Sequence, residues 1–270
     1  MEALANELAT IALCWRLERR DGVALGFTTH DRDLAIGGLA YRAAPGMLPS
    51  AITLTDGFDL DTLDIEGALS SDAITGADLR AGRWDGATVA VFMVDWKAPE
   101  GETLPLACGE LGEVTIRGDA FAAELKGPTA AFERPVVEQT SPECRAMLGD
   151  KRCRIDLAAR TRLTRIVAIR EESVEVADAA VGDNVYGYGR LRWLSGANAG
   201  LETALLSSSG ASFSLRDPAP FEANIGDLVE IVEGCDKRLS TCVGRFGNAV
   251  NFRGEPHLPG MDLLTRYPGA

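Results

Sequence analysis

Residues 8–29 read LATIALCWRLERRDGVALGFTT, and this pattern indicates a β fold. Residues 8–19 mix apolar–polar alternation with residue types that favour strands. Asp21-Gly22 is a strong signal for a tight turn, and an extended pattern resumes over residues 23–29. The stretch therefore predicts a β-hairpin.

Similar short strand patterns follow along the chain, with Gly, Pro or Asp at most of the junctions. They cover residues 39–43, 50–55, 59–65, 87–96, 110–117, 120–126, 162–169, 172–177, 188–194, 201–207, 211–216 and 227–233. Helical patterning is scarce, and its best case is a turn or two over residues 142–149. We therefore predict a mainly β protein with two small β-barrel or sandwich domains and a loop-rich C-terminal segment.

Charge is distributed unevenly over the 270 residues. The chain carries 40 acidic and 27 basic residues, a net charge of −13. Residues 1–140 hold 23 acids and 11 bases, whereas residues 141–270 hold 17 acids and 16 bases. This change beside the loop-like run EQTSPE predicts a domain boundary near residue 140. We expect a β domain at 1–140, a first cysteine segment at 141–160, a second barrel at 161–234 and a second cysteine segment at 235–270.

The composition excludes several classes of protein. With 46% hydrophobic and 25% charged residues, the chain has the composition of a globular protein. Its acidic balance argues against specific nucleic-acid binding, because phosphate contacts need a surplus of Lys and Arg. No stretch approaches the ~18–20 apolar residues of a membrane span, and the first residues lack the basic region of a signal peptide. The common catalytic motifs are absent from the sequence, so we do not expect an enzyme.

Six cysteines form two classes. Cys14 and Cys108 lie within strand patterns, where small buried hydrophobic residues are expected. The other four form a C-x8-C pair and a C-x6-C pair in the least regular segments, about 80 residues apart. These are Cys144, Cys153, Cys235 and Cys242.

Three interpretations of the paired cysteines remain open. Disulfides are rare in reducing compartments, and zinc sites usually contain a short C-x2–4-C knuckle, which is missing in both pairs. An iron–sulfur cluster tolerates irregular spacing and is the leading interpretation. Nearby basic residues could offset the negative charge of four thiolates around such a cluster. They are Arg145, Lys151, Arg152, Arg154, Lys237, Arg238, Arg245 and Arg253.

Four long motifs resemble the signatures of a tail hub protein family of phages and gene transfer agents, which is similar to the tail tip protein L of phage lambda. The motifs are WRLERRDGVALGFTTHDRDL at 15–34, DLRAGRWDGATVAVFMVDW at 78–96, SPECRAMLGDKRCRIDL at 141–157 and GCDKRLSTCVGRFGNAVNFRGEPHLPG at 234–260. Together they span nearly the whole chain.

This resemblance implies a structural hub of a siphovirus or gene-transfer-agent tail tip, or baseplate. The hub would be a homotrimer that links the distal tail protein ring to the central, megatron-like tip protein. It would belong to the tail of a virion or virus-like particle assembled in the bacterial cytoplasm, with residues 1–140 as its N-terminal hub domain. The resemblance also implies that Cys144, Cys153, Cys235 and Cys242 bind an iron–sulfur cluster, expected to be 4Fe–4S.

Two alternatives differ from this interpretation. One is a cluster-dependent redox or nucleic-acid-processing enzyme, and the other is a structural hub stapled by zinc. Among the remaining polar residues, we expect His30 to fix a loop and His257 to be structural. Glu255 stands where the family often has a bulkier apolar residue, so we expect it to face solvent.

Overall fold

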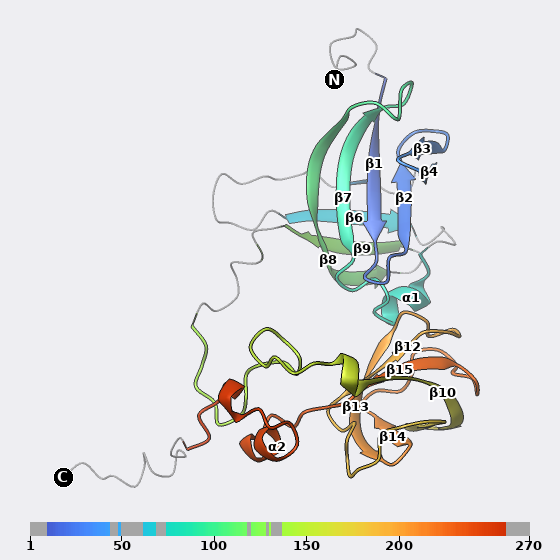
Figure 1. Ribbon diagram of the computed structural model, residues 1–270. Helices are drawn as coiled ribbons and strands as arrows, with labels where there is room; N and C mark the ends of the chain where they lie inside the picture. Colours follow the sequence, from blue (N-terminus) through green and yellow to red (C-terminus); the bar gives the residue numbers. More distant parts are fainter. Residues whose placement is uncertain are drawn as a thin grey trace, which may run out of the picture. The chain divides into compact units, whose positions relative to one another are not determined.

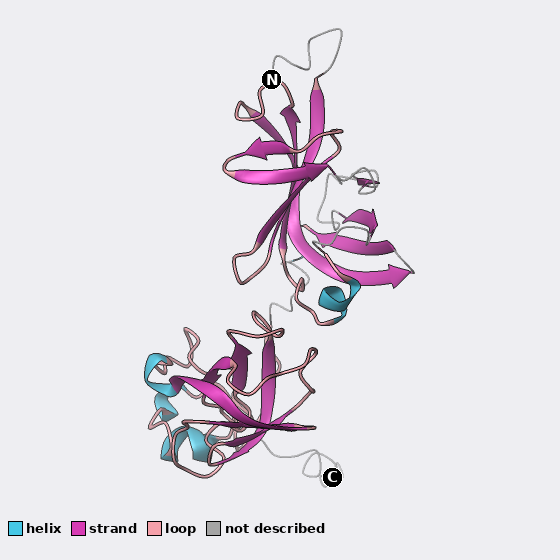
Figure 2. Cartoon of the chain, turned by 90° about the vertical axis from the view of Figure 1, so that its right-hand side faces the viewer, coloured by secondary structure: helices cyan, strands magenta, loops and turns pink. Residues whose placement is uncertain are grey.

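A computed structural model describes residues 10–43, 48–49, 62–68, 74–117, 120–127, 130 and 137–257. The chain divides into two compact units, Met1–Val136 and Val137–Ala270, which we call unit 1 and unit 2. The regular secondary structure of both is mainly β, which confirms the predicted fold class at this level (Figures 1 and 2). The predicted strand at 50–55 lies outside the described residues. No helix in these ranges is long and apolar enough to cross a bilayer.

Unit 1 contains one sheet of nine strands in the order β3-β4-β2-β1-β7-β8-β9-β6-β5. Their bounds are β1 Ile11–Glu18, β2 Ala24–Thr28, β3 Leu34–Ile36, β4 Leu39–Ala43, β5 Leu48–Pro49, β6 Thr62–Ala68, β7 Thr88–Asp95, β8 Thr103–Arg117 and β9 Ala120–Lys126. The predicted hairpin is confirmed, since β1 and β2 pair antiparallel across the turn at Gly22, whose φ of 87° suits glycine.

The sheet of unit 1 is mixed, because β2 and β4 run parallel whereas the other pairs are antiparallel. Strand β8 has 15 residues and pairs with both β7 and β9. A register shift between Leu111 and Val114 interrupts its ladder with β9, as a bulge does where a strand bends. The sequence predicted a barrel or sandwich for this part of the chain, whereas the pairings of the described residues trace a single sheet.

Both faces of this sheet carry a buried cluster. Trp15, Phe27 and Trp84 belong to the larger one, together with Leu79 of the short helix α1 at Gly76–Arg80. Cys14 and Tyr41 belong to the smaller one. Thr75 caps α1, since its hydroxyl accepts the backbone N–H of Asp78 at 3.1 Å.

The two cysteines of unit 1 differ in burial. Cys14 is buried as predicted, but the prediction for Cys108 is wrong, because Cys108 is exposed. It pairs with Ala90 of β7, and Ala90 points to the face opposite the buried Val89 and Val91. Residues paired across strands share a face, so Cys108 lies on the face opposite Val89 and Val91, which is also the face of Cys14, but at a position that is left uncovered.

Unit 2 is built around a closed antiparallel barrel of six strands in the order β10-β11-β14-β13-β12-β15, which confirms the second barrel. The strands are β10 Thr161–Arg170, β11 Ser173–Val176, β12 Arg190–Trp193, β13 Glu202–Ser209, β14 Ser212–Leu215 and β15 Leu228–Val232. In β12, β14 and β15 buried side chains alternate with more exposed ones, and Trp193, Phe213 and Ile231 of these strands point into the barrel interior.

Loop segments precede and follow the barrel strands in the sequence. They contain the helix α2 at Leu239–Gly244 and two short 3-10 helices, η3 at Ala158–Arg160 and η4 at Ala249–Asn251. The predicted helical turn at 142–149 is wrong, because turns and bends occupy these residues. The Asp150 carboxylate accepts the backbone N–H groups of Met147, Arg152 and Cys153, which competes with helix formation.

Candidate metal centre

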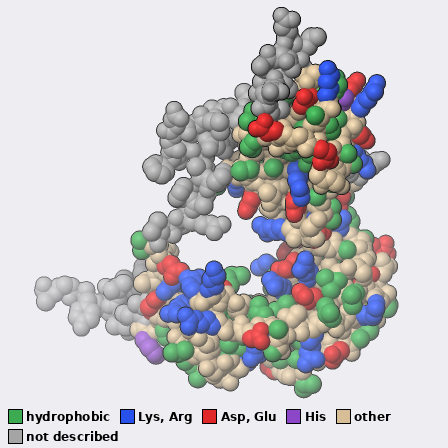
Figure 3. Space-filling view, turned by 45° about the horizontal axis from the view of Figure 1, so that its top comes forward, with side chains coloured by type: hydrophobic (Ala, Val, Ile, Leu, Met, Phe, Trp, Pro, Cys, Tyr) green, Lys and Arg blue, Asp and Glu red, His purple; other side chains and the backbone are tan. Residues whose placement is uncertain are grey.

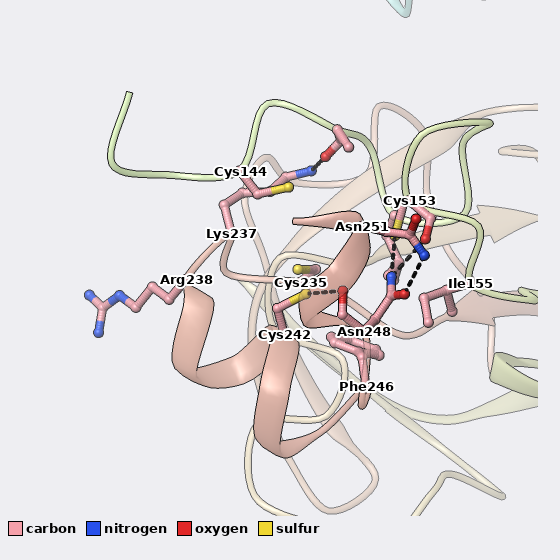
Figure 4. Close-up of a pocket in the computed structure, with 12 residues that line it drawn as sticks. Cys144, Cys153, Ile155, Cys235, Lys237, Arg238, Cys242, Phe246, Asn248 and Asn251 are labelled. Carbon is pink, nitrogen blue, oxygen red and sulfur yellow. Dashed lines mark hydrogen bonds between the residues drawn. The ribbon is translucent and has the colours of Figure 1, made fainter. Parts of the chain in front are cut away.

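All four paired cysteines line one pocket in unit 2 (Figure 4). Cys144 and Cys153 come from the loops before the barrel, Cys235 follows β15, and Cys242 lies in α2. The other lining residues are Ala146, Leu148, Ile155, Lys237, Arg238, Phe246, Asn248 and Asn251. No His, Asp or Glu is among them, so thiols are the metal-binding side chains of this pocket.

Backbone hydrogen bonds join the two cysteine segments directly. The N–H of Cys144 donates to the carbonyl of Lys237 at 2.9 Å, and the N–H of Arg145 donates to the carbonyl of Arg253 at 3.0 Å. The N–H of Arg253 lies 3.4 Å from the Cys144 sulfur, which it can serve as a donor. These contacts place the first cysteine beside residues that follow it by more than 90 positions.

The side chains of Arg145 and Glu255 add a bidentate ion pair to this junction. Nη1 and Nη2 of Arg145 reach the two carboxylate oxygens at 2.6 and 2.8 Å, and the N–H of Ser141 donates to Oε2 at 3.0 Å. The hydrogen bond from Arg145, followed by that from Ser141, lowers the pKa of Glu255 to about 2. The side chain of Glu255 is 39% exposed, in keeping with the expectation that it faces solvent, but its carboxylate also has partners on the first cysteine segment.

A tight turn orients Cys153. Oδ1 of Asp150 accepts the N–H of Cys153 at 2.6 Å and that of Arg152 at 2.9 Å. Burial raises the pKa of Asp150, but the backbone donors outweigh it, and the net shift is downward. The following residue, Arg154, has a φ of 62°, a left-handed conformation that is uncommon outside glycine.

The late cysteine segment is anchored to the barrel through Arg245. Its guanidinium donates to the Glu233 carboxylate at 2.6 Å and to the carbonyls of Val185 and Gly234 at 2.7 and 3.1 Å. Arg160, at the start of the barrel, donates to the same Glu233 oxygen at 2.7 Å. The ring of Phe246, which lines the pocket, lies 4.8 Å from the guanidinium carbons of Arg160 and Arg245.

The four sulfurs influence one another electrostatically. Burial raises the pKa of Cys242 first, and Cys144, Cys235 and Cys153 each raise it further. Burial also raises the pKa of Cys235, against an opposing contribution from Lys237. Four thiolates in such a pocket repel one another, so a cationic centre between them is needed to hold all four deprotonated.

Basic side chains surround the pocket. Figure 3 shows Lys and Arg side chains gathered over this part of unit 2. Lys151, Arg154, Arg238 and Arg253 are exposed, and Figure 4 shows Arg238 extending away from the pocket. The Nζ atom of Lys237 is held by the carbonyl of Ala146 at 2.5 Å. Arg145, Arg152 and Arg245 are paired with carboxylates, so these five cations supply the positive charge that an anionic metal–thiolate centre requires.

The spacing of the sulfurs bears on the size of a metal centre. Within the described ranges, no three His, Cys, Asp or Glu side chains lie close enough together to hold a single metal ion. A zinc ion with Zn–S bonds of about 2.3 Å would draw its sulfurs to within about 4 Å of one another. A set of four thiols is the donor set of both structural zinc sites and iron–sulfur clusters.

The two histidines lie outside the pocket lining. Nδ1 of His30 accepts the N–H of Arg32 at 3.1 Å, and its ring lies 5.1 Å from that of Trp96. These contacts fit the predicted role of His30 in fixing a loop. The sequence predicts that Asn248 fixes the C-terminal loop through side-chain-to-backbone hydrogen bonds. The structure shows such a bond, but its acceptor is the carbonyl of Cys153 in the first cysteine segment, a partner that the sequence did not identify.

Comparisons with known proteins agree with this architecture. The family model for the "baseplate hub protein, N-terminal attachment domain" matches residues 1–156, and the model for "phage conserved hypothetical protein BR0599" matches residues 184–262. A chain in the solved structure "Virion of native gene transfer agent (GTA) particle" is 39% identical, with a TM-score of 0.86. That match covers 98% of this chain and 94% of the other. No curated protein matches the sequence.

The fold and these matches define a structural protein of a phage-like virion tail. The chain belongs to the baseplate hub protein family. The predicted family and the predicted location in a virion tail are thereby confirmed.

Proposed function

We propose that this chain is a homotrimeric baseplate hub that links the distal tail ring to the central tip protein, and that a 4Fe–4S cluster staples its unit 2. One observation carries the cluster proposal. Four cysteines from two segments about 80 residues apart line a single pocket that offers only thiols as metal-binding side chains.

The linking role is supported by the division of the chain into two units. The matched family model describes an attachment domain and covers all of unit 1. Unit 2 has its own closed barrel and its own cysteine pocket. Two separately built units give the hub one surface for the tail ring and another for the tip protein. The role is structural and requires no catalytic group.

The ligands of the cluster are Cys144, Cys153, Cys235 and Cys242. When bound, the cluster supplies iron–sulfur bonds that cross-link the two segments. In the chain-entropy treatment of disulfides, a cross-link closing a loop of this length stabilises the fold by about 4 kcal/mol. Arg253 donates its N–H toward the Cys144 sulfur, and Lys237 places a cation beside Cys235.

Metal analysis of protein purified without oxygen tests the cluster. We expect a brown protein that absorbs at about 400 nm and contains iron and sulfide in equal amounts. Cys235→Ser should lose both, whereas Cys108→Ser should retain both, because the exposed Cys108 lies in unit 1. A colourless protein with one equivalent of zinc would reject the cluster in favour of the zinc-stapled hub.

Cross-linking of intact particles, followed by mass spectrometry, tests the linking role. Cross-links from this chain to both the distal tail ring and the central tip protein are expected. Native mass spectrometry of the purified chain should give a trimer. Absence of cross-links to either neighbour would overturn the linking role without touching the cluster proposal.

A further inference from the structure

We propose that Asn248 is the positioning residue of the cysteine pocket: its side-chain amide ties Cys153 to the late cysteine segment and donates a hydrogen bond to the Cys153 sulfur. The sulfur part of this inference rests on the proposed cluster. The tether part concerns the metal-free chain as well, and the two can be tested separately.

The side chain of Asn248 reaches across 95 positions of sequence. Its Nδ2 atom donates to the carbonyl of Cys153 at 2.7 Å and lies 3.7 Å from the Cys153 sulfur (Figure 4). An amide nitrogen has two protons, so one can serve the carbonyl while the other points toward the sulfur. A single amide group therefore contacts both the backbone and the thiol of one proposed ligand.

The backbone of Asn248 contacts Cys242, a member of the other cysteine pair. Its N–H donates to the carbonyl of Cys242 at 3.0 Å, and its carbonyl accepts the Cys242 thiol at 3.4 Å. Asn248 thus touches Cys153 through its side chain and Cys242 through its main chain. Lys237 makes a comparable link through its backbone, between Cys144 and Cys235, so each late cysteine is joined to one early cysteine through a neighbouring residue.

The orientation of the Asn248 amide follows from its partners. A backbone carbonyl is only an acceptor, so the nitrogen must face Cys153. The opposite end, Oδ1, accepts Nδ2 of Asn251 at 2.7 Å. Asn248 is only 9% exposed, and a buried amide with these bonds satisfied has little freedom to rotate away.

The consequence for a bound cluster is chemical. A cysteine that binds a cluster does so as a thiolate, and a thiolate accepts a hydrogen bond from a donor such as the Asn248 amide more strongly than a neutral thiol does. Donors to ligand sulfur stabilise the added electron and raise the reduction potential of a cluster. The substitution Asn248→Asp would keep the shape of the side chain and replace the hydrogen-bond donor by an anionic acceptor.

The loaded protein tests the sulfur bond. Asn248→Asp should shift the reduction potential to a more negative value and speed the loss of iron to a chelator by about tenfold or more. Asn224→Asp is the matched control, because it adds the same charge to unit 2 at an exposed position outside the pocket. An unchanged potential and an unchanged rate of iron loss would overturn the donor role.

The metal-free protein tests the tether. In Asn248→Ala, alkylation of Cys153 should be about tenfold faster than in the wild type, with the barrel still folded by near-ultraviolet circular dichroism. An alkylation rate equal to that of the wild type would overturn the tether. If the wild type carries no iron, the cluster proposal and the sulfur bond fail, while the alkylation experiment still decides the tether.

Discussion

Arg145 and Glu255 are 110 residues apart in the sequence and form a bidentate ion pair with N–O distances of 2.6 and 2.8 Å. The pair joins the two cysteine segments. Arg145 also contacts Glu138, which in turn binds Arg152, so the stretch at 138–152 and the segment that carries Glu255 share one set of charges. This arrangement makes the junction sensitive to acid.

Acidification should loosen residues 253–257. The folded-state pKa of Glu255 is lowered to about 2, so the pair contributes its full stability above the ordinary pKa of 4.5. That contribution is lost progressively as the pH falls from about 4.5 toward 2. Hydrogen exchange should show faster opening of this segment across that range. Glu255→Gln should open it at neutral pH and remove most of the pH dependence, and a variant with the wild-type profile would contradict the assignment.

Gly149→Ala should destabilise the cysteine segment by about 1–3 kcal/mol. Gly149 has a φ of 81°, and an added Cβ would overlap the side chain of Leu157. Gly244→Ala is the control, because Gly244 ends α2 with open space around it and should be neutral or stabilising by up to about 1 kcal/mol. Thermal unfolding of both variants checks this, and equal melting temperatures would refute the strain argument.

Arg245→Gln should release α2 from the barrel. The substitution removes the charge-assisted bond to Glu233 and leaves the carbonyls of Val185 and Gly234 with fewer donors. Each hydrogen bond to a charged group contributes about 1.5–3 kcal/mol to the free energy of unfolding. Exchange protection of residues 239–251 should fall. Arg238→Gln should leave that protection unchanged, since Arg238 points away from the pocket and is exposed.

Two buried tryptophans should respond differently to replacement by Phe. Nε1 of Trp193 donates to the Thr203 hydroxyl at 3.2 Å, whereas Nε1 of Trp84 has no hydrogen-bond partner among the described residues. Removing a bonded N–H leaves a buried acceptor short of a donor, and removing an unbonded one does not. Trp193→Phe should therefore cost about 1 kcal/mol more than Trp84→Phe, measured as loss of exchange protection in the surrounding strands.

Strand positions could be predicted from sequence because alternation and turn residues are local signals. Asp21-Gly22 marked the first hairpin, and the pattern at 87–96 marked β7. The exposure of Cys108 was missed, because a strand pattern does not reveal which positions on a face are covered by other parts of the chain.

Of the candidate site, only the four cysteines could be predicted from the sequence. The two cysteine spacings and the family motif pointed to four residues that the structure brings to one pocket. The contacts that hold them could not be predicted, because Arg145 with Glu255 and Asn248 with Cys153 join residues about 100 positions apart. Helix α2 was missed as well, since six residues without an apolar period give no helical signal.

Cys235 lies three residues beyond β15, and β15 pairs with both β10 and β12 in a barrel with no free edge. Tension on the late cysteine segment would therefore act along β15 and shear two ladders of hydrogen bonds at once, instead of unzipping one. A particle component that must stay intact under mechanical load gains from this route, because many bonds must fail together before the strand slips.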